Sequence, residues 1–377
     1  MRITIRITYL LAVIISVLIL FIGHKVVTRD LILFQDESHD VTRANVLSIL
    51  GRVSPEDDLF PGMGETIIFE AEVRQGELKG EVIIAEQFIG NFLQQPTKEV
   101  SQGDSVLLVN FDNQWFFNGH VRTNMLLILS IMFALCVLFF GGIKGFNTII
   151  SLVLTCGAVF AVFIPSILQG HNIYIMAFLV CIYTTIMTLV IVVGYNKKTL
   201  AAITGCISGI LISGLIALIM DRALFLTGIV DEHSRYLASL PLDVPINLKA
   251  IIFAGIIIGA MGAILDVAMS IASSLWELNE KARDINFKTL IRSGLNIGRD
   301  IMGSMANTLI LAYIGSSLSV VLILSVYSNS LIELFNMEMI VVEILQALAG
   351  SFGILFAIPL TVFFCATFYL KKTRSGH

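Results

Sequence analysis

The chain has 377 residues, of which 56% are hydrophobic and 14% are charged, and its mean hydropathy is +0.88. Soluble globular domains carry about 45–50% apolar and about 25% charged residues, so the composition excludes an ordinary soluble enzyme and a disordered chain and indicates a membrane protein. The formal net charge of −4 hides an asymmetry, because residues 24–122 contain 16 acidic and 8 basic side chains and the remainder contains 12 acidic and 16 basic ones.

Eight apolar runs are long enough to cross a hydrocarbon core of about 30 Å, which takes roughly 20 residues as a helix. They are 7–23, 125–143, 146–164, 173–194, 200–220, 250–271, 303–327 and 340–370. The predicted fold is an all-α polytopic membrane protein of about eight transmembrane helices, with a small all-β extracytoplasmic domain between helices 1 and 2. The predicted divisions are an anchor at 1–24, an outer domain at 25–122 and a seven-helix membrane domain at 123–377.

The first and last runs each leave an alternative open. Residues 7–23 follow Arg2 and Arg6 and could be the apolar part of a signal peptide. The run lacks a small-x-small cleavage site before Lys25, which favours an uncleaved anchor. The last run is too long for a perpendicular crossing and contains Pro359, so a tilted or kinked helix is expected.

The positions of lysine and arginine predict the orientation, because short cytoplasmic loops are enriched in these residues. With the N-terminus inside, thirteen basic residues fall in cytoplasmic segments: Arg2, Arg6, Lys144, Lys197, Lys198, Lys281, Arg283, Lys288, Arg292, Arg299, Lys371, Lys372 and Arg374. The short outer loops hold three: Arg222, Arg235 and Lys249. Both termini are therefore predicted to be cytoplasmic in a bacterial cytoplasmic membrane, with residues 25–122 outside.

The outer segment reads as a small domain of five strands, either a barrel or a sandwich. The predicted strands, rich in Val, Ile and Phe, are Val41–Leu50, Thr66–Arg74, Leu78–Glu86, Ser105–Asn110 and Trp115–Phe117. In the second strand apolar and polar residues alternate, which is typical of a strand with one buried face. The acidic surface of this domain could attract cations or a basic partner, or simply keep an exposed module soluble.

Signatures of metal, cofactor and nucleic-acid chemistry are not found in the sequence. Asp36, Glu37, His39 and Asp40 have the side-chain types of a cation site but match no ligand loop. The five cysteines all lie inside predicted spans, so no disulfide is expected in the outer domain, and the sequence has no Cys/His spacing of a zinc site. Phosphate-binding glycine loops, basic aromatic patches and nucleophile elbows are missing as well, so no cofactor, no nucleic acid and no enzymatic reaction is predicted.

The sixth run carries the most informative pattern. At 100° per residue, six small or acidic positions share an arc of about 80°: Gly255, Gly259, Gly262, Asp266, Ser270 and Ser273. Small residues on one stripe allow a neighbouring helix to come close. A carboxyl group in a span costs about 2.5–3.5 kcal/mol, so Asp266 is predicted to face protein or water and to relay a proton or ion. The alternative is a carboxylate merely solvated at the cytoplasmic end of its helix.

Two later runs carry further polar groups. Asp300, Gly303, Ser304 and Asn307 share one face of the seventh run, with Arg299 just before them. In the eighth run, Glu343, Gln346, Gly350 and Gly353 share another face, and Glu343 could equally be solvated at the outer interface. Gly205 and Gly209 in the fifth run are predicted to serve helix packing.

The segment 276–299 between the sixth and seventh runs mixes basic and large apolar residues. This pattern is typical of a helix lying on the inner headgroup surface. Anchoring is the simplest role for such a segment, and coupling to a cytoplasmic partner is the alternative.

Two stretches carry a family resemblance. They are Gly262-Ala-Ile-Leu-Asp266-Val-Ala-Met-Ser-Ile-Ala-Ser-Ser274 and Asn296-Ile-Gly-Arg-Asp300-Ile-Met-Gly-Ser-Met-Ala-Asn307-Thr-Leu-Ile-Leu-Ala-Tyr-Ile-Gly315. They resemble the YibE/F family of bacterial membrane proteins, as does the layout of one anchor, an outer domain and a block of spans over residues 120–370. The resemblance implies a cytoplasmic-membrane protein, most readily of a Gram-positive bacterium, and brings no established activity.

A weaker resemblance concerns the order of features around Asp266. An aspartate near the end of an outside-to-inside span, a charged cytoplasmic helix and a span rich in Ser, Thr and Asn resemble the corresponding segment of SecD/SecF and RND-type exporters. There the resemblance implies a carboxylate of the proton pathway. The chain departs from that pattern by two extra spans and by its small all-β outer domain, so only an analogy of partial topology connects them.

Two functions from different classes follow. The first is a secondary transporter or export-associated permease in which Asp266 exchanges a proton or cation against Asn307, Asp300 or Arg299. The second is a membrane assembly or sensory scaffold whose outer domain binds a partner and whose carboxylate is structural. The expected partners are the lipid bilayer, an extracytoplasmic protein, and a second copy of the chain or a paired family member.

Overall fold

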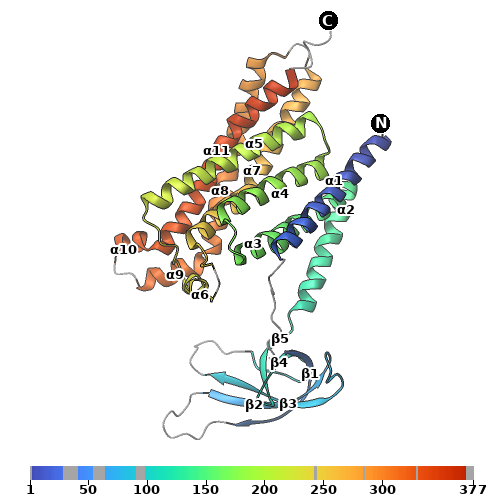
Figure 1. Ribbon diagram of the computed structural model, residues 1–377, viewed down its shortest axis with the longest axis vertical. Helices are drawn as coiled ribbons and strands as arrows, with labels where there is room; N and C mark the ends of the chain where they lie inside the picture. Colours follow the sequence, from blue (N-terminus) through green and yellow to red (C-terminus); the bar gives the residue numbers. More distant parts are fainter. Residues whose placement is uncertain are drawn as a thin grey trace. The chain divides into compact units, whose positions relative to one another are not determined.

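The computed structural model describes residues 2–28, 41–53, 64–90, 98–241, 244–282, 285–327 and 330–370, with the side chains of 2–8 and 327 left undescribed. The chain forms two compact units, one of Met1–Ile32 with Leu138–His377 and one of Leu33–Val137. The helices, which include the π-helix η1, are α1 (Arg2–Val27), α2 (Thr123–Gly157), η1 (Ala158–Phe163), α3 (Ile164–Leu168), α4 (Ile173–Val193), α5 (Lys197–Ala223), α6 (Glu232–Ala238), α7 (Leu248–Lys281), α8 (Phe287–Ser316), α9 (Leu318–Tyr327), α10 (Leu331–Asn336) and α11 (Glu338–Leu370) (Figure 1). The strands are β1 (Thr42–Val53), β2 (Gly64–Val73), β3 (Val82–Gly90), β4 (Ser105–Phe111) and β5 (Gln114–His120).

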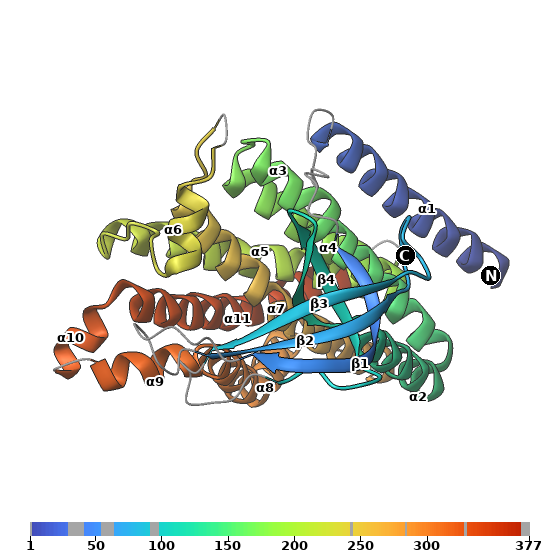
Figure 2. The same ribbon diagram turned by 90° about the horizontal axis from the view of Figure 1, so that it is seen from below.

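The five strands close into a barrel in the order β1-β2-β3-β5-β4 (Figure 2). Strand β3 pairs parallel to β5, and the other pairings are antiparallel. This is a five-stranded Greek-key barrel of the kind found in OB-folds. The prediction of a small β-domain is confirmed, and the barrel replaces the sandwich that the sequence left open.

The core of the barrel includes the apolar residues that alternate with polar ones in the second predicted strand, β2. Ile67, Phe69, Ala71 and Val73 are fully buried, whereas the intervening residues are partly exposed. Strand β3 starts at Val82 rather than at the predicted Leu78, because the chain turns at Gly76 and Gly80, which both have positive φ, and the Gly80 amide donates to the Val73 carbonyl. The predicted strand therefore began inside a turn.

Local capping explains where the long helices begin. Asn172, Asn196, Asn247 and Asn286 precede α4, α5, α7 and α8, and each side-chain oxygen accepts a hydrogen bond from the backbone amide three residues later. Asparagine is among the preferred residues at this position because it satisfies an amide that has no partner inside the helix. The caps place the helix starts close to the beginnings of the apolar runs.

Within the described residues, six helical segments are long and apolar enough to cross a membrane, or seven if α8 and α9, bent by 59°, count as one span. The predicted number of eight is not confirmed, because the second and third predicted spans fall within one stretch, Thr123–Leu168. That stretch is broken at Gly142, whose φ of 53° and ψ of −129° are not helical. The last predicted span is the single helix α11, which continues through Pro359.

The larger unit is a helix bundle whose centre is formed by α5, α7 and α11. At one end, Lys197 donates to the Phe368 carbonyl, and Trp276 stacks edge-on against Tyr369. At the other end, Glu338 of α11 contacts the loop after α5. The start of α1 and the end of α11 lie at the same end of this bundle (Figure 1).

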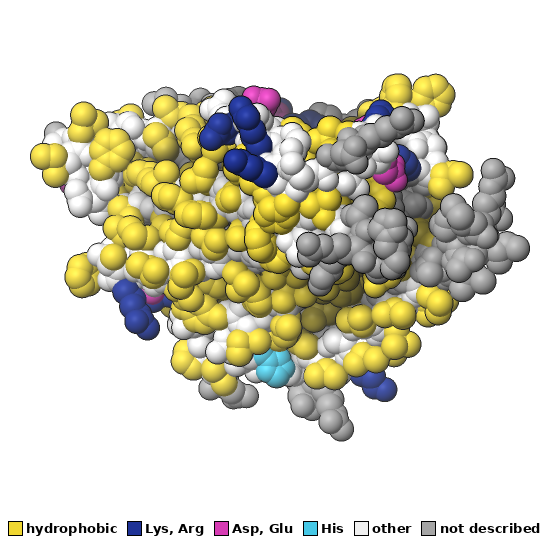
Figure 3. All heavy atoms as spheres, turned by 90° about the horizontal axis from the view of Figure 1, so that it is seen from above, with side chains coloured by type: hydrophobic (Ala, Val, Ile, Leu, Met, Phe, Trp, Pro, Cys, Tyr) yellow, Lys and Arg dark blue, Asp and Glu magenta, His cyan; other side chains and the backbone are white. Residues whose placement is uncertain are grey.

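Hydrophobic side chains cover most of the helix surface seen in Figure 3, and Lys and Arg side chains gather in small groups. Many large apolar residues of the candidate spans are exposed, including Met125, Leu127 and Phe139. A helix that exposes apolar side chains all round fits a hydrocarbon environment rather than water. The chain is therefore a membrane protein with a small β-domain.

Candidate functional site

The face of α7 that carries Asp266 lies on the outside of the helix bundle. Ile257, Ile264 and Ile271 take the opposite face and are fully buried against α5 and α11. The helix period places the stripe of small residues opposite these isoleucines, so it points away from the centre. Asp266 and Gly262 are both exposed.

The stripe is open at two glycines and covered at one. Space around Gly262 is free to 4 Å, and only the Gln346 amide, at 3.9 Å, comes near a Cβ built on Gly255. A Cβ on Gly259 would lie 2.5 Å from the hydroxyl oxygen of Tyr313 in α8. Close packing of the stripe within one chain is thus limited to its contact with Tyr313.

Asp266 has no hydrogen bond or ion pair within the described part of the chain. It is close enough to Cys206 of α5 for its charge to act on that buried thiol. Thr185 of α4 lies 3.6 Å from the Cys206 sulfur, and Thr184 donates to the Met261 sulfur of α7 at 3.4 Å. Asp266 is therefore in electrostatic range of Cys206, which belongs to a small buried group of hydroxyl and sulfur atoms between α4, α5 and α7.

The other predicted site residues do not join Asp266 through any bond in the described residues. Arg299, Asp300 and Asn307 are exposed on α8. Glu343 of α11 is half-buried and lies in electrostatic range of the Tyr313 hydroxyl, which is buried and without a hydrogen-bond partner in the described structure. Tyr313 thus stands between Glu343 and the stripe, although sequence reasoning gave it no role.

Four of the predicted packing glycines lie at close helix crossings. A Cβ on Gly209 would be 2.8 Å from the Cβ of Ala357 and 2.9 Å from the Gly353 carbonyl oxygen. A Cβ on Gly205 would overlap Thr361, and one on Gly350 would lie 2.8 Å from Leu309. These glycines allow the backbones of α5 and α11 to meet and allow α8 to reach α11.

A carboxylate that sequence reasoning did not single out closes the end of the bundle opposite Lys197. Glu338 Oε1 accepts hydrogen bonds from the amides of Thr227 and Gly228, both at 2.7 Å, and Oε2 accepts one from the Thr227 hydroxyl at 2.8 Å. Gly228 has a φ of 90° and packs against Leu248. The signal in the sequence was an acidic residue in the first turn of a helix, which favours the helix dipole.

The segment 276–299 is divided between two bundle helices. Residues up to Lys281 belong to α7, and α8 begins at Phe287. Trp276 packs on Tyr369 with ring centroids 5.0 Å apart, and Leu290 and Gly294 are buried. The apolar residues that suggested a helix on the headgroup surface face α11 and α7 instead.

The described residues hold no group of three or more His, Cys, Asp or Glu that could bind a metal ion. The acidic cluster Asp36, Glu37, His39 and Asp40 lies outside the described residues. The free cysteines in this part of the chain are Cys136, Cys156, Cys181, Cys206 and Cys365.

Comparison with known proteins gives one match. The family model described as YibE/F-like protein matches residues 129–371, nearly two thirds of the chain, from the second turn of α2 to the end of α11. No curated protein and no solved structure matches the chain.

Proposed function

Because the chain belongs to the YibE/F-like protein family, and its model covers the helix that carries Asp266, we propose that it is a secondary transporter or export-associated permease coupled to protons or a cation. The observation that carries the proposal is a carboxyl group within a candidate span, exposed on the bundle and without a polar partner in the described chain. Such a group is costly to place in a membrane and commonly belongs to an ion or proton pathway. The proposal is for transport, not for an enzymatic reaction.

Protonation of Asp266 lowers the free-energy cost of placing this side chain on an apolar surface. A neutral carboxyl group is far less costly in a low-dielectric environment than a carboxylate. When Asp266 binds a proton, or a cation that neutralises its charge, the α7 face therefore tolerates an apolar environment. When the proton or cation leaves, the carboxylate favours a polar one. A conformational equilibrium between two packings of α7 and α8 could then be shifted by the ion.

In this proposal a second chain covers the face of α7 that is exposed in a single chain. Arg299, Asp300 and Asn307 are exposed on α8, which packs against α7. We propose that a second copy or a paired family member covers this face and brings its own polar groups to Asp266. The small residues at Gly255 and Gly262 would allow a close approach.

The proposed topology has eight crossings, with both termini in the cytoplasm of a bacterium and residues 25–122 outside its cytoplasmic membrane. The break at Gly142 supports two crossings within Thr123–Leu168. Lys197, Lys281 and the end of α11 lie at one end of the bundle, as the positive-inside rule requires of cytoplasmic segments.

The test is proton movement in liposomes that contain the purified full-length chain, driven by a potassium diffusion potential and followed with a trapped pH dye. Asp266→Asn should insert and fold like the parent and lose at least tenfold in proton flux, because the amide cannot exchange a proton. Glu277→Gln, at the end of the same helix in an ion pair with Lys281, is the matched control and should keep the parental flux. Equal flux in Asp266→Asn and the parent would remove the relay role.

A membrane assembly or sensory scaffold is the second candidate, and the surface of the barrel favours it. Val82, Ile84 and Phe88 point outward from β3 and are more than half exposed. Exposed apolar side chains on one strand can form a protein-binding surface. For a scaffold, Asp266→Asn gives either a folding defect or no change, which distinguishes the two functions.

A further inference from the structure

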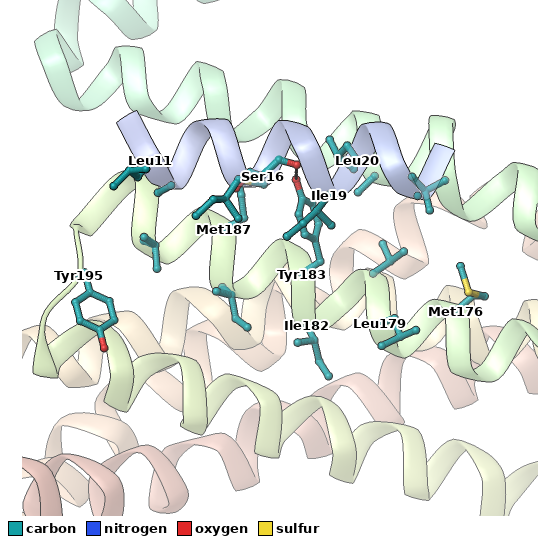
Figure 4. A pocket seen from close by; sticks show the side chains of 18 residues that line it. Leu11, Ser16, Ile19, Leu20, Met176, Leu179, Ile182, Tyr183, Met187 and Tyr195 are labelled. Carbon is teal, nitrogen blue, oxygen red and sulfur yellow. Dashed lines mark hydrogen bonds between the residues drawn. The ribbon is translucent and has the colours of Figure 1, made fainter. Parts of the chain in front are cut away.

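An elongated apolar groove of about 780 Å³ runs between α1 and α4 (Figure 4), and Ala158 and Val162 of η1 also line it. On α1 it extends from Leu11 to Gly23, and on α4 from Val190 back to Met176. Twelve residues of α-helix rise about 18 Å, close to the roughly 15 Å depth of one leaflet of the hydrocarbon core. The groove therefore has the length of one acyl chain in a leaflet.

Two polar bonds, together with apolar contacts of Val13 and Leu20, attach α1 beside the groove. Tyr183 of α4 donates its hydroxyl to the Ser16 carbonyl at 3.1 Å. His24 Nδ1 donates to the Ala161 carbonyl at 2.8 Å. Ala161 lies in the π-helix η1, and Pro165, four residues later, has no N–H that could bond this carbonyl in the α-helical pattern.

The groove opens on the side that faces the bilayer. Leu11, Ile15 and Ile19 line it, and each is about half exposed, at 49–52%. An empty apolar cleft of this size would forfeit dispersion contacts, and water in it would find few hydrogen-bonding partners. Hydrocarbon from the surrounding lipid is the chemistry that fits.

One end of the groove has a polar and basic border. Tyr195 lines that end and is 81% exposed (Figure 4). Lys198 follows it in the first turn of α5. Lys144 lies one turn before Asn147, whose amide donates to the Ile191 carbonyl at the same end of α4. Neither ammonium has a hydrogen bond or ion pair within the described residues.

We propose that this groove binds one anionic phospholipid, with an acyl chain between α1 and α4 and the headgroup phosphate at Lys144, Lys198 and Tyr195. Basic pockets beside transmembrane helices are suited to anionic headgroups. The acyl chain adds to the apolar contacts of α1 with the bundle, so the lipid helps to hold α1 in place. This site is separate from Asp266 and does not depend on the proposed transport.

Native mass spectrometry of the delipidated full-length protein tests the site. Dioleoylphosphatidylglycerol and dioleoylphosphatidylcholine are titrated separately. The parent should retain one phosphatidylglycerol at a concentration at least tenfold below that needed for phosphatidylcholine. Equal retention of the two lipids would mean nonspecific annular lipid and would overturn the proposal.

Paired variants separate the headgroup from the acyl chain. Lys144→Gln with Lys198→Gln should reduce phosphatidylglycerol retention to the phosphatidylcholine level, whereas Lys288→Gln, an exposed lysine on α8, should not. Ile19→Trp should fill the groove and remove the tight lipid. Leu18→Trp is its control, because Leu18 is similarly exposed at 55% but does not line the groove. Tight retention in Ile19→Trp would contradict the site.

Photolabelling of the unmodified protein tests the site even if the variants fail to fold. A phosphatidylglycerol with a photoreactive group in its acyl chain should label peptides of α1 and α4 above all other helices. Even labelling over the lipid-facing helices would overturn the proposal.

Discussion

Glycine has two different roles on the bundle helices, which the structure separates residue by residue. Gly209 lies where α5 meets α11, and any side chain there would press on the Gly353 carbonyl. Gly262 lies on the open face of α7 with free space around it. The same residue type thus serves close packing at one position and leaves a surface uncovered at the other.

Alanine substitutions should show the difference. Gly209→Ala should lower the free energy of unfolding by about 1–3 kcal/mol, because the added methyl group meets backbone and Ala357. Gly262→Ala should leave it within about 1 kcal/mol of the parent, since the methyl group is unopposed and helix propensity improves. Unfolding in micelles measures both, and an equal loss in the two variants would contradict the packing described.

Sequence periodicity could place Asp266 among small residues on one face of its helix, but could not say what that face meets. The angle of a residue on a helix is local, whereas the neighbours of the helix are set by the whole bundle. Packing over long sequence distances brings Tyr313 against this face and brings Cys206 within electrostatic range of Asp266. Neither residue lies in a local sequence pattern that would mark it as a site residue, so sequence periodicity could not identify them.

At the scale of elements, the barrel contains a buried polar side chain that connects two segments. Gln87 of β3 is 3% exposed, accepts from the Val100 amide at 2.8 Å and donates to the Lys98 carbonyl at 3.0 Å. The segment at residues 98–100 has no strand partner of its own. The Gln87 amide therefore satisfies the buried Val100 amide and shares the Lys98 carbonyl with the His120 ring nitrogen, which lies 3.5 Å away.

Replacing this amide should destabilise the barrel. Gln87→Leu should cost about 1–3 kcal/mol, because a buried amide and a carbonyl lose their partners. Hydrogen–deuterium exchange of the full-length chain should show faster exchange at residues 98–100. Glu86→Leu changes the neighbouring exposed position and should leave this exchange unchanged; equally fast exchange in both variants would refute the role of Gln87.

Strands and helices differ in how well local patterns predicted them. Alternation predicted β2 because one face of that strand is buried, and the apolar runs predicted the positions of α4, α5, α7 and α11. The parallel pairing of β3 with β5 depends on chain crossing and has no local signal. Segment 276–299 was misread as one surface helix because its mixture of charges and apolar residues also suits the ends of two packed helices.

At the scale of the whole molecule, hydropathy predicted the membrane class, and the charge asymmetry separated the outer segment from the rest. The number of spans could not be predicted from hydropathy in the same way. A non-helical glycine inside an apolar stretch decides whether that stretch is one helix or two, and its backbone angles are not visible in composition. The count therefore depends on Gly142 and on the bend between α8 and α9.

Cysteine labelling should determine the crossings on either side of Gly142. With Lys79→Cys in the barrel, a membrane-impermeant maleimide should react in intact cells. With Lys144→Cys, it should react only after permeabilisation, since the proposed turn is cytoplasmic. The parent is the blank, because its five cysteines lie in α2, α4, α5 and α11. Labelling of Lys144→Cys in intact cells, or no labelling in either condition, would contradict eight crossings.

The hydrogen bonds of Glu338 have a consequence for biosynthesis. Thr227 and Glu338 are 111 residues apart, so the ribosome completes α6 to α10 before the carboxylate exists. At synthesis rates of about 5–20 residues per second this delay is about 6–22 s. During that interval the loop after α5 has been delivered to the membrane while its amides still lack Glu338. Closure of this end of the bundle is thus tied to the arrival of the last helix, and a nascent chain truncated before residue 338 cannot complete it.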